Sequence, residues 1–166
     1  MLRDLVIRQR PSAAALVAAI AYLGLLAASV ITMRAVGISA ANAGIRSLNW
    51  RALVIGGVAG GLLVAPVWHV PPLTAASASW LLLAVVVEEV AFRGVLFAIL
   101  RRLGGLPLAV VGSTAAFTLA HIGRAGWPSL ALVALAGLFL GLLRAMRDDL
   151  WAPGIAHFLM DLVSLP

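Results

Sequence analysis

Three charged residues lie within a long apolar stretch of the chain. Between residues 52 and 100, Glu88, Glu89 and Arg93 are the only Asp, Glu, Lys or Arg residues. An ionised side chain at the centre of a membrane-spanning helix costs about 2.5–3.5 kcal/mol on insertion scales. Ionisable residues in such a position are therefore candidates for function, and the structural alternative is a buried ion pair that only holds helices together.

The spacing of these residues predicts different roles for the two carboxylates. Glu89 and Arg93 are four residues apart, so on an α-helix they share a face and we expect them to form an ion pair. Glu88 is rotated by about 100° from Glu89 and is left without that cation. A carboxylate without a cationic partner in a low-dielectric environment is suited to act as a general base near neutral pH. We therefore predict that Glu88 is catalytic and that Glu89 and Arg93 support its helix.

Two histidines and an aspartate could complete such a site. His121 follows Phe117 by four residues, and His157 and Asp161 are four residues apart within another apolar segment. A carboxylate that accepts the imidazole N–H would fix the tautomer and orientation of His157. Each feature alone also has an ordinary structural explanation, such as an interfacial histidine or a capped polar pair. Because polar side chains in lipid associate, we expect these three residues and Glu88 to face one internal cavity.

The elements that must position these residues are apolar segments of membrane-spanning length. Hydrophobic residues make up 63% of the 166 residues, whereas soluble domains have about 45–50%. A helix needs about 20 predominantly apolar residues to span a bilayer. We predict an all-α, polytopic transmembrane helix bundle of about six spans, at residues 13–33, 52–68, 75–100, 107–121, 129–146 and 150–165. Residues 1–74 would supply two N-terminal spans and residues 75–166 a core of four, within one integrated bundle. His69, at the end of the second span, is interpreted as an interfacial residue.

The charge distribution favours a membrane and argues against nucleic acid as a partner. The net charge is +6, and the basic residues lie mostly at the ends of the apolar segments, without interleaved aromatic residues. The absence of cysteine excludes disulfides and thiolate metal sites. In the six-span arrangement one side of the membrane carries Arg34, Arg46, Arg51, Arg101, Arg102, Arg144 and Arg147. The other side carries Arg3, Arg8, Arg10 and Arg124. The positive-inside rule assigns the side with seven arginines to the cytoplasm, although the three arginines near the N-terminus argue for the reverse orientation.

Small residues recur at four-residue spacing in two of the segments. The pairs are Gly56 and Gly60, Gly57 and Gly61, and Gly137 and Gly141. Such spacing lets the backbones of two helices approach closely. We interpret the pairs as packing surfaces within the chain, and a dimer interface is the alternative.

The order of the chemical motifs resembles that of one family of membrane enzymes. Glu-Glu-x-x-x-Arg at residues 88–93, Phe-x-x-x-His at residues 117–121 and His-x-x-x-Asp at residues 157–161 resemble the CAAX-protease and bacteriocin-processing family of intramembrane proteases. The segment Leu-Trp-Ala-Pro-Gly-Ile-Ala-His at residues 150–157 is similar to the last motif helix of that family. The resemblance covers residues 75–165. It implies that Glu88 is the catalytic glutamate, that His121 and His157 are its partners, and that Asp161 occupies a position where the family has Asn or Asp.

Together the residues and the resemblance predict a membrane-embedded endopeptidase, a multi-pass protein of the cell membrane that acts on a membrane protein or peptide. Glu88 would activate water, and the histidines would position that water or stabilise the oxyanion. Glu88, His121 and His157 also have the composition of a catalytic zinc site, so a divalent metal such as zinc is left open. The alternatives are a non-catalytic bacteriocin-immunity or scaffold protein of the same family and a small ion-coupled transporter, because intramembrane Glu, His and Asp also build proton relays.

Overall fold

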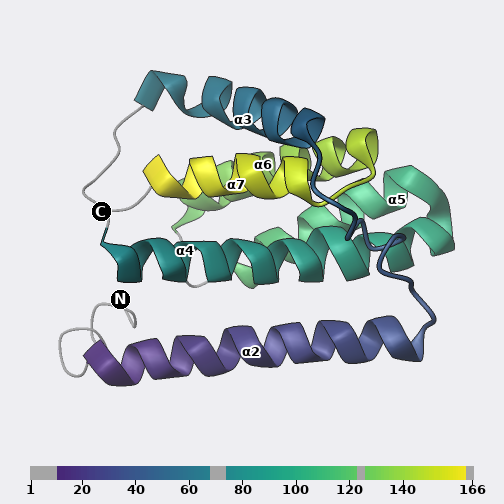
Figure 1. The fold of residues 1–166 in the computed structure, drawn as a ribbon, viewed down its shortest axis with the longest axis horizontal. Coiled ribbons are helices and arrows are strands. Elements are labelled where there is room, and N and C mark those ends of the chain that lie inside the picture. Colours follow the sequence, from purple (N-terminus) through teal and green to yellow (C-terminus); the bar gives the residue numbers. More distant parts are fainter. Residues whose placement is uncertain (1–10, 68–73, 123–125, 164–166) are drawn as a thin grey trace.

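The computed structural model describes residues 11–67, 74–122 and 126–163 (Figure 1). The elements are α2 (Pro11–Ala35), α3 (Trp50–Val64), the 3₁₀ turn η1 (Ala65–Val67), α4 (Ala75–Glu88), the π-helix η2 (Glu89–Leu96), α5 (Phe97–Ala120), α6 (Trp127–Arg147) and α7 (Trp151–Val163). No β-strand occurs in the described ranges, which confirms the all-α prediction. Some predicted features lie outside these ranges, namely His69, Arg3, Arg8, Arg10, Arg124 and the ends of the predicted spans 52–68 and 150–165.

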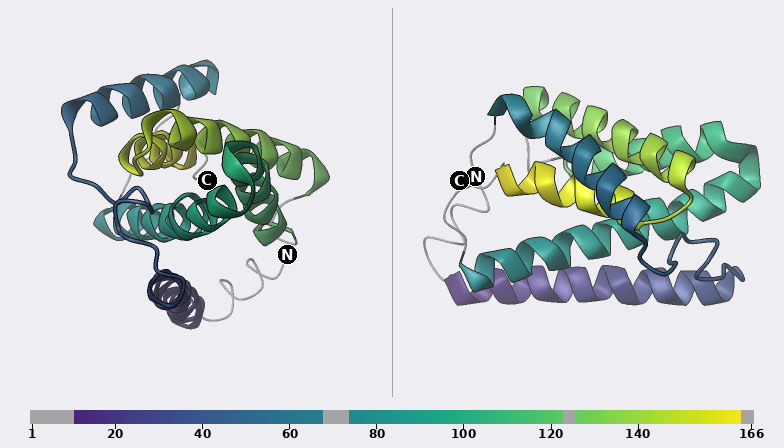
Figure 2. Two further views of the ribbon diagram at one scale, coloured as in Figure 1. Left: turned by 90° about the vertical axis from the view of Figure 1, so that its right-hand side faces the viewer. Right: turned by 45° about the horizontal axis from the view of Figure 1, so that its top comes forward.

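The two N-terminal helices lie on opposite sides of the rest of the molecule (Figures 1 and 2). The helix α3 packs along α7, and α2 lies beside α4 and η2. The elements between them, from α4 to α7, pack on one another, with extensive contact between α5 and α6. The N-terminal helices therefore each cover one side of the core instead of pairing with each other.

One long helix runs through α4, η2 and the first part of α5. It ends at Gly104 (φ −151°, ψ 22°) and Gly105 (φ 75°, ψ −168°), where the backbone leaves helical geometry. The positive φ of Gly105 is one that glycine adopts without steric cost, so this pair lets the chain change direction. The predicted break between residues 100 and 107 is thereby confirmed. The second part of α5 runs back, so that Phe117 lies against Arg93 of η2.

The π-helix η2 begins at Glu89, directly after Glu88. Its backbone hydrogen bonds run between residues i and i+5, one residue further than in an α-helix. π-helical segments are rare in proteins. Where one occurs, it is frequently part of a functional site. The apolar pattern of the sequence predicts an ordinary α-helix here, because hydrophobic spacing does not report a local change of hydrogen-bond register. The change of register falls on the candidate catalytic residues.

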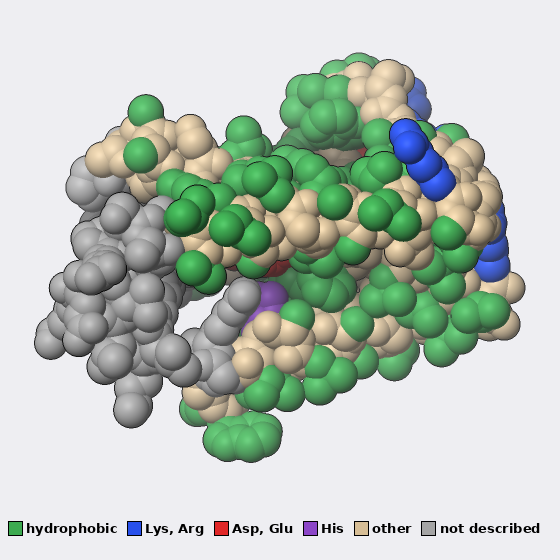
Figure 3. Space-filling view, turned by 90° about the horizontal axis from the view of Figure 1, so that it is seen from below, with side chains coloured by type: hydrophobic (Ala, Val, Ile, Leu, Met, Phe, Trp, Pro, Cys, Tyr) green, Lys and Arg blue, Asp and Glu red, His purple; other side chains and the backbone are tan. Residues whose placement is uncertain are grey.

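Several of the described helices carry long apolar surfaces. In the described ranges, the helices Leu16–Ala35 and Trp127–Arg147 are long and apolar enough to cross a membrane, and α3 is a shorter apolar helix. Only 6% of the apolar window in Leu16–Ala35 is buried against the protein. Hydrophobic side chains cover the flank of the molecule, and the arginines gather at one end (Figure 3). Lipid is the natural solvent for such a flank.

Glycines let α3 and α7 pack backbone against backbone. A Cβ atom on Gly60 would lie 2.8 Å from the Cα atom of Ala156, and one on Gly56 would be equally crowded by α7. On the neighbouring face of α3, Gly57 and Gly61 have no such neighbour within 4 Å. The Gly56 and Gly60 pair is therefore a packing surface within the chain, as predicted.

We expect Gly60→Ala to destabilise the protein by about 1–3 kcal/mol, because the added methyl group would meet the backbone of α7 and no side-chain rotation relieves that contact. Gly61→Ala is the matched control and should melt at or slightly above the wild-type temperature, since alanine favours a helix. Thermal unfolding of the purified protein in detergent measures both changes. If Gly60→Ala melted like the wild type, α3 would not be packed on α7 in this way.

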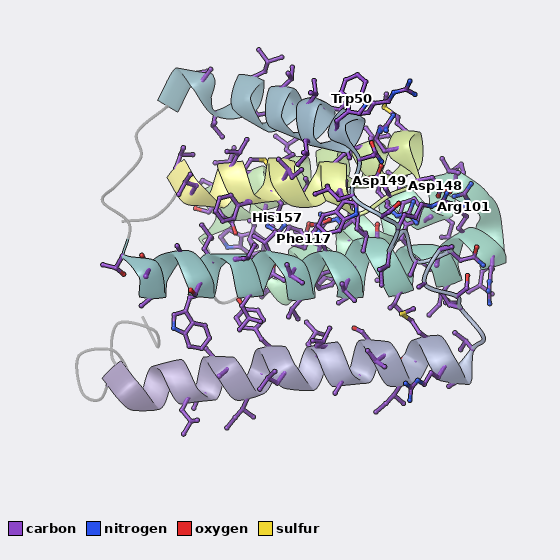
Figure 4. All side chains as sticks on the ribbon, viewed as in Figure 1. Trp50, Arg101, Phe117, Asp148, Asp149 and His157 are labelled. Carbon is purple, nitrogen blue, oxygen red and sulfur yellow. The ribbon has the colours of Figure 1, made fainter. Side chains whose placement is uncertain are left out.

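One carboxylate joins three elements at the arginine-rich end of the molecule. Asp148 follows α6 in the left-handed conformation (φ 53°). It forms ion pairs with Arg46 (2.8 Å), Arg101 (2.9 Å) and Arg144 (2.8 Å). These arginines come from the α2–α3 connection, from α5 and from α6, and Figure 4 shows Arg101, Asp148 and Asp149 close together at this end. These three arginines therefore lie at one end of the molecule, and their place relative to a membrane stays a prediction.

The ion pairs of Asp148 should make stability depend on pH. Burial tends to raise the pKa of the Asp148 carboxyl, but the hydrogen bond from Arg144 and the arginine charges outweigh it and hold the pKa below its ordinary value of 3.8. The stabilisation is therefore complete above pH 3.8 and is lost as the pH falls through the lowered pKa. We expect Asp148→Asn to lower the melting temperature near neutral pH by about 2–4 °C, a modest effect because the carboxylate is 43% exposed. Melting curves across this pH range test it, and a difference that persisted in strong acid would contradict the ion-pair account.

Candidate active site

The two adjacent glutamates lie where α4 passes into η2. Glu88 is the last residue of α4 and Glu89 the first of η2. Both are buried, with 9% and 2% of their surface exposed. Because the long helix that carries them runs through the middle of the bundle, side chains from α2 and α7 reach them.

Glu89 and Arg93 form the ion pair that their spacing predicts. Arg93 Nη1 lies 3.1 Å from Glu89 Oε1, and both side chains are almost fully buried. Among the described residues Arg93 Nη1 has no hydrogen-bond partner, so its contact with Glu89 is described as an ion pair. Arg93 Nη2 donates to the carbonyl oxygen of Gly137 at 3.3 Å, and the guanidinium carbon lies 4.1 Å from the centre of the Phe117 ring. Arg93 thus connects η2 with α5 and α6.

His157 on α7 lies among the carboxylates of the site. Its Nδ1 is 2.9 Å from Glu89 Oε1, whereas its Nε2 is 3.5 Å from Asp161 Oδ2 and 3.9 Å from Glu88 Oε2. Since an ionised carboxylate only accepts hydrogen bonds, Nδ1 carries the hydrogen and donates it to Glu89. The sequence predicted that Asp161 orients His157, but the shortest contact is with Glu89. Spacing along one helix does not reveal a partner on another helix, so sequence reasoning assigned Glu89 to Arg93 alone.

His121 caps the C-terminal end of α5 and is half-buried. Its Nδ1 lies 2.7 Å from the carbonyl oxygen of Phe117, to which it donates, so in the neutral ring Nε2 presents a lone pair. Its ring centre is 4.6 Å from that of Phe117, which in turn is 5.7 Å from that of His157. Figure 4 shows His157 and Phe117 close together between α7 and the long helix that contains α4. His121 is thus next to the carboxylate cluster but separated from His157 by Phe117.

A tyrosine that the sequence analysis did not select also reaches the site. The Tyr22 hydroxyl on α2 lies 3.5 Å from Glu88 Oε1, which is long for a hydrogen bond but places α2 beside the catalytic candidate. The chain contains one tyrosine, and a single phenolic hydroxyl in an otherwise apolar span is a signal that could have drawn attention to it. Its contact with Glu88 depends on how α2 packs, which the sequence motifs do not describe.

The structure therefore brings three of the four predicted catalytic side chains, Glu88, His157 and Asp161, within 4 Å of a neighbour in the set. His121 is close enough to interact electrostatically with Glu88 and Asp161. A histidine and part of an acidic side chain are visible at the bottom of a hollow in the apolar flank (Figure 3).

The residues proposed for zinc do not form a ligand set. Among the described residues, no three His, Cys, Asp or Glu side chains are grouped so that they could hold a metal ion. The hydrogen bonds of His157 to Glu89 and of His121 to a backbone carbonyl are made at Nδ1, which leaves Nε2 of each ring for another partner. The chemistry considered below is described for the protein groups.

Comparison with known proteins identifies the family. The family model described as type II CAAX prenyl endopeptidase Rce1-like matches residues 69–163, more than half of the chain. No curated protein and no solved structure gave a significant match. The matched region contains all six residues of the candidate site that the sequence analysis selected, and the resemblance seen in their order is confirmed. The chain thus belongs to the Rce1-like family of type II CAAX prenyl endopeptidases, a family of intramembrane proteases.

Proposed function

We propose that this protein is an active intramembrane endopeptidase in which Glu88 is the general base. The observation that carries the proposal is a buried carboxylate without a paired arginine, Glu88, beside an imidazole that a second carboxylate, Glu89, holds in place. Arg93 pairs with Glu89, donates to the carbonyl oxygen of Gly137 and lies over the Phe117 ring. Glu88 is therefore available for proton transfer. An immobile acceptor next to an oriented histidine is the arrangement that general-base hydrolysis requires.

The proposed reaction needs water and the peptide bond of the substrate. Glu88 takes a proton from water as the water oxygen attacks the carbonyl carbon, and the carbonyl electrons move onto the oxygen. When the tetrahedral intermediate collapses, the carbonyl re-forms, the C–N bond breaks, and the leaving amine receives the proton from Glu88. A positioned general base contributes typically about 10²–10⁴-fold to such a reaction.

The histidines act on the other atoms of this step. His157 in its protonated form donates from Nδ1 to Glu89 and directs Nε2–H toward the side where Glu88 lies, so it can stabilise the developing oxyanion. A single oxyanion donor contributes about 10²–10³-fold in known hydrolases. His121 would position the water through Nε2, since its Nδ1 is used by a backbone carbonyl. Asp161 would assist the orientation of His157 from the same helix.

The proposed setting is a multi-pass protein of the cell membrane with about six crossings. The long helix broken at Gly104–Gly105 supplies two of them, and α2, α3, α6 and α7 supply the others. Exposed tryptophans support this placement, because Trp50 lies at the arginine-rich end and Trp127 begins α6 at the other end. Residues 75–166 would form the catalytic core, flanked by the two N-terminal spans.

The substrate class that we propose is a membrane protein or peptide with a prenylated C-terminal cysteine motif. This proposal rests on the family description and on the opening of the site into the apolar flank. The test is cleavage by the full-length protein, reconstituted in liposomes, of farnesylated and unprenylated versions of one fluorescent peptide, read by mass spectrometry. Cleavage within the C-terminal motif, faster for the farnesylated peptide, is the expected result. If neither peptide nor a panel of membrane peptides were cleaved, the protein would act as a scaffold, and a proton flux in the same liposomes would indicate a transporter.

A further inference from the structure

The arginine-rich end contains a cavity that the proposed reaction does not use. It has a volume of about 290 Å³ and is lined by Asn42, Ala98, Arg101, Arg102 and Asp148. Arg101 is 13 residues after Glu88 on one continuous helix, so the cavity lies about 20 Å from the candidate active site. It is therefore a separate site.

Positive charge at this cavity exceeds the negative charge that balances it. The carboxylate of Asp148 contacts three guanidinium groups, those of Arg46, Arg101 and Arg144. Arg102 donates to the carbonyl oxygens of residues 36 and 37, which are uncharged. Asp149 also interacts with Arg144, so two carboxylates oppose these four arginines and an excess of positive charge remains.

The arginines of the cavity also retain donors for a ligand. A guanidinium group carries five N–H donors in a fixed planar arrangement that matches phosphate and carboxylate oxygens. The hydrogen bonds of the described residues use one donor of Arg101 and two of Arg102. Those bonds hold both guanidinium groups in place, so a ligand would meet donors that are already oriented.

The surroundings place this cavity at the level of lipid headgroups. Trp50 is 67% exposed at the same end, and Trp151 donates its indole N–H to the carbonyl oxygen of Arg46. Tryptophans of this kind mark the membrane–water interface. Leu103, directly after the arginine pair, is 74% exposed, so apolar surface for an acyl chain adjoins the charged cavity.

We propose that this cavity binds the phosphate of an anionic phospholipid headgroup, with Arg101 and Arg102 as its charged ligands. A phospholipid and inorganic phosphate would both present a phosphate group to these arginines. The tryptophans and the adjacent leucine favour the lipid as the ligand. A bound anion would balance the charge of the four arginines and hold the α2–α3 connection, α5 and the end of α6 together. The proposal does not depend on proteolytic activity.

The test is titration of the full-length protein in detergent with phosphatidylglycerol, phosphatidylcholine or inorganic phosphate, followed by native mass spectrometry. Phosphatidylglycerol should bind more tightly than phosphatidylcholine, and Arg101→Gln and Arg102→Gln should each weaken it about fivefold. Arg51→Gln is the matched control, because Arg51 lies in the first turn of α3 at the same end but does not line the cavity. If Arg102→Gln unfolds, Arg101→Gln alone decides, since Arg101 pairs with the partly exposed Asp148 and its replacement disturbs the fold less.

Two results would overturn the proposal. Equal weakening by Arg51→Gln and Arg101→Gln would mean that the lipid is attracted by the general charge of this end and not bound in the cavity. Inorganic phosphate that displaced phosphatidylglycerol at comparable concentration would mean that a free anion, and not a lipid, is the ligand.

Discussion

Glu88→Gln is expected to reduce proteolysis by about 10²–10⁴-fold while the protein remains folded and inserted. Glutamine has nearly the same shape as glutamate and still forms hydrogen bonds, but it does not take a proton from water. Glu88 forms no ion pair with Arg93, so its replacement leaves no buried cation without a partner. Cleavage of a membrane peptide by the reconstituted protein measures the rate, and melting in detergent measures the fold.

Activity and melting temperature of the Glu88→Gln variant are each compared with those of the wild type. Loss of activity with an unchanged melting temperature identifies Glu88 as a chemical group. Loss of both would indicate a structural role. Cleavage by Glu88→Gln at the wild-type rate would refute the proposed mechanism and favour the scaffold interpretation.

Glu89→Gln, unlike Glu88→Gln, is expected to destabilise the fold and to lower the free energy of unfolding by about 3–5 kcal/mol. Arg93 is fully buried, and removing its negative partner leaves a guanidinium charge in a low-dielectric environment. The same change replaces the charged acceptor of His157 Nδ1 with a neutral amide oxygen. Thermal and denaturant unfolding should therefore show a large loss, and activity should fall because His157 is less well oriented.

A second substitution distinguishes these two effects of Glu89. The double variant Glu89→Gln with Arg93→Met removes both charges, so part of the lost stability should return. Activity should not return, because His157 still lacks its carboxylate. If Glu89→Gln melted at the wild-type temperature, the buried ion pair with Arg93 would not be the support that the structure indicates.

The sequence predicted the parts of the site that depend on one helix. Glu89 and Arg93 are four residues apart and form the expected pair, and Asp161 lies near His157 for the same reason. The break before residue 107 was also predictable, since glycines and a proline mark it. These features depend on local geometry, which residue spacing describes directly.

The remaining features depend on contacts between helices, for which one sequence gives no distances. The bond between Glu89 and His157 joins η2 with α7, and Tyr22 reaches Glu88 from α2. Likewise, the four-residue spacing of the glycines predicted that they pack against another helix, but not which pair faces α7. The π-helix was missed because its cause is backbone hydrogen bonding and not side-chain polarity.

The π-helix η2 has a consequence for protein engineering. A π segment shifts the hydrogen-bond register, so the α-helical parts before and after it are out of phase. Removing one residue between Glu89 and Leu96 that makes no site contact, such as Val90, would favour a regular α-helix in its place. A π turn accommodates one extra residue, so the helix beyond Leu96 would keep its face and the arginine pair at residues 101–102 its neighbours. Only the side chains within the former π segment would move, and Arg93 would follow Glu89 by three residues instead of four.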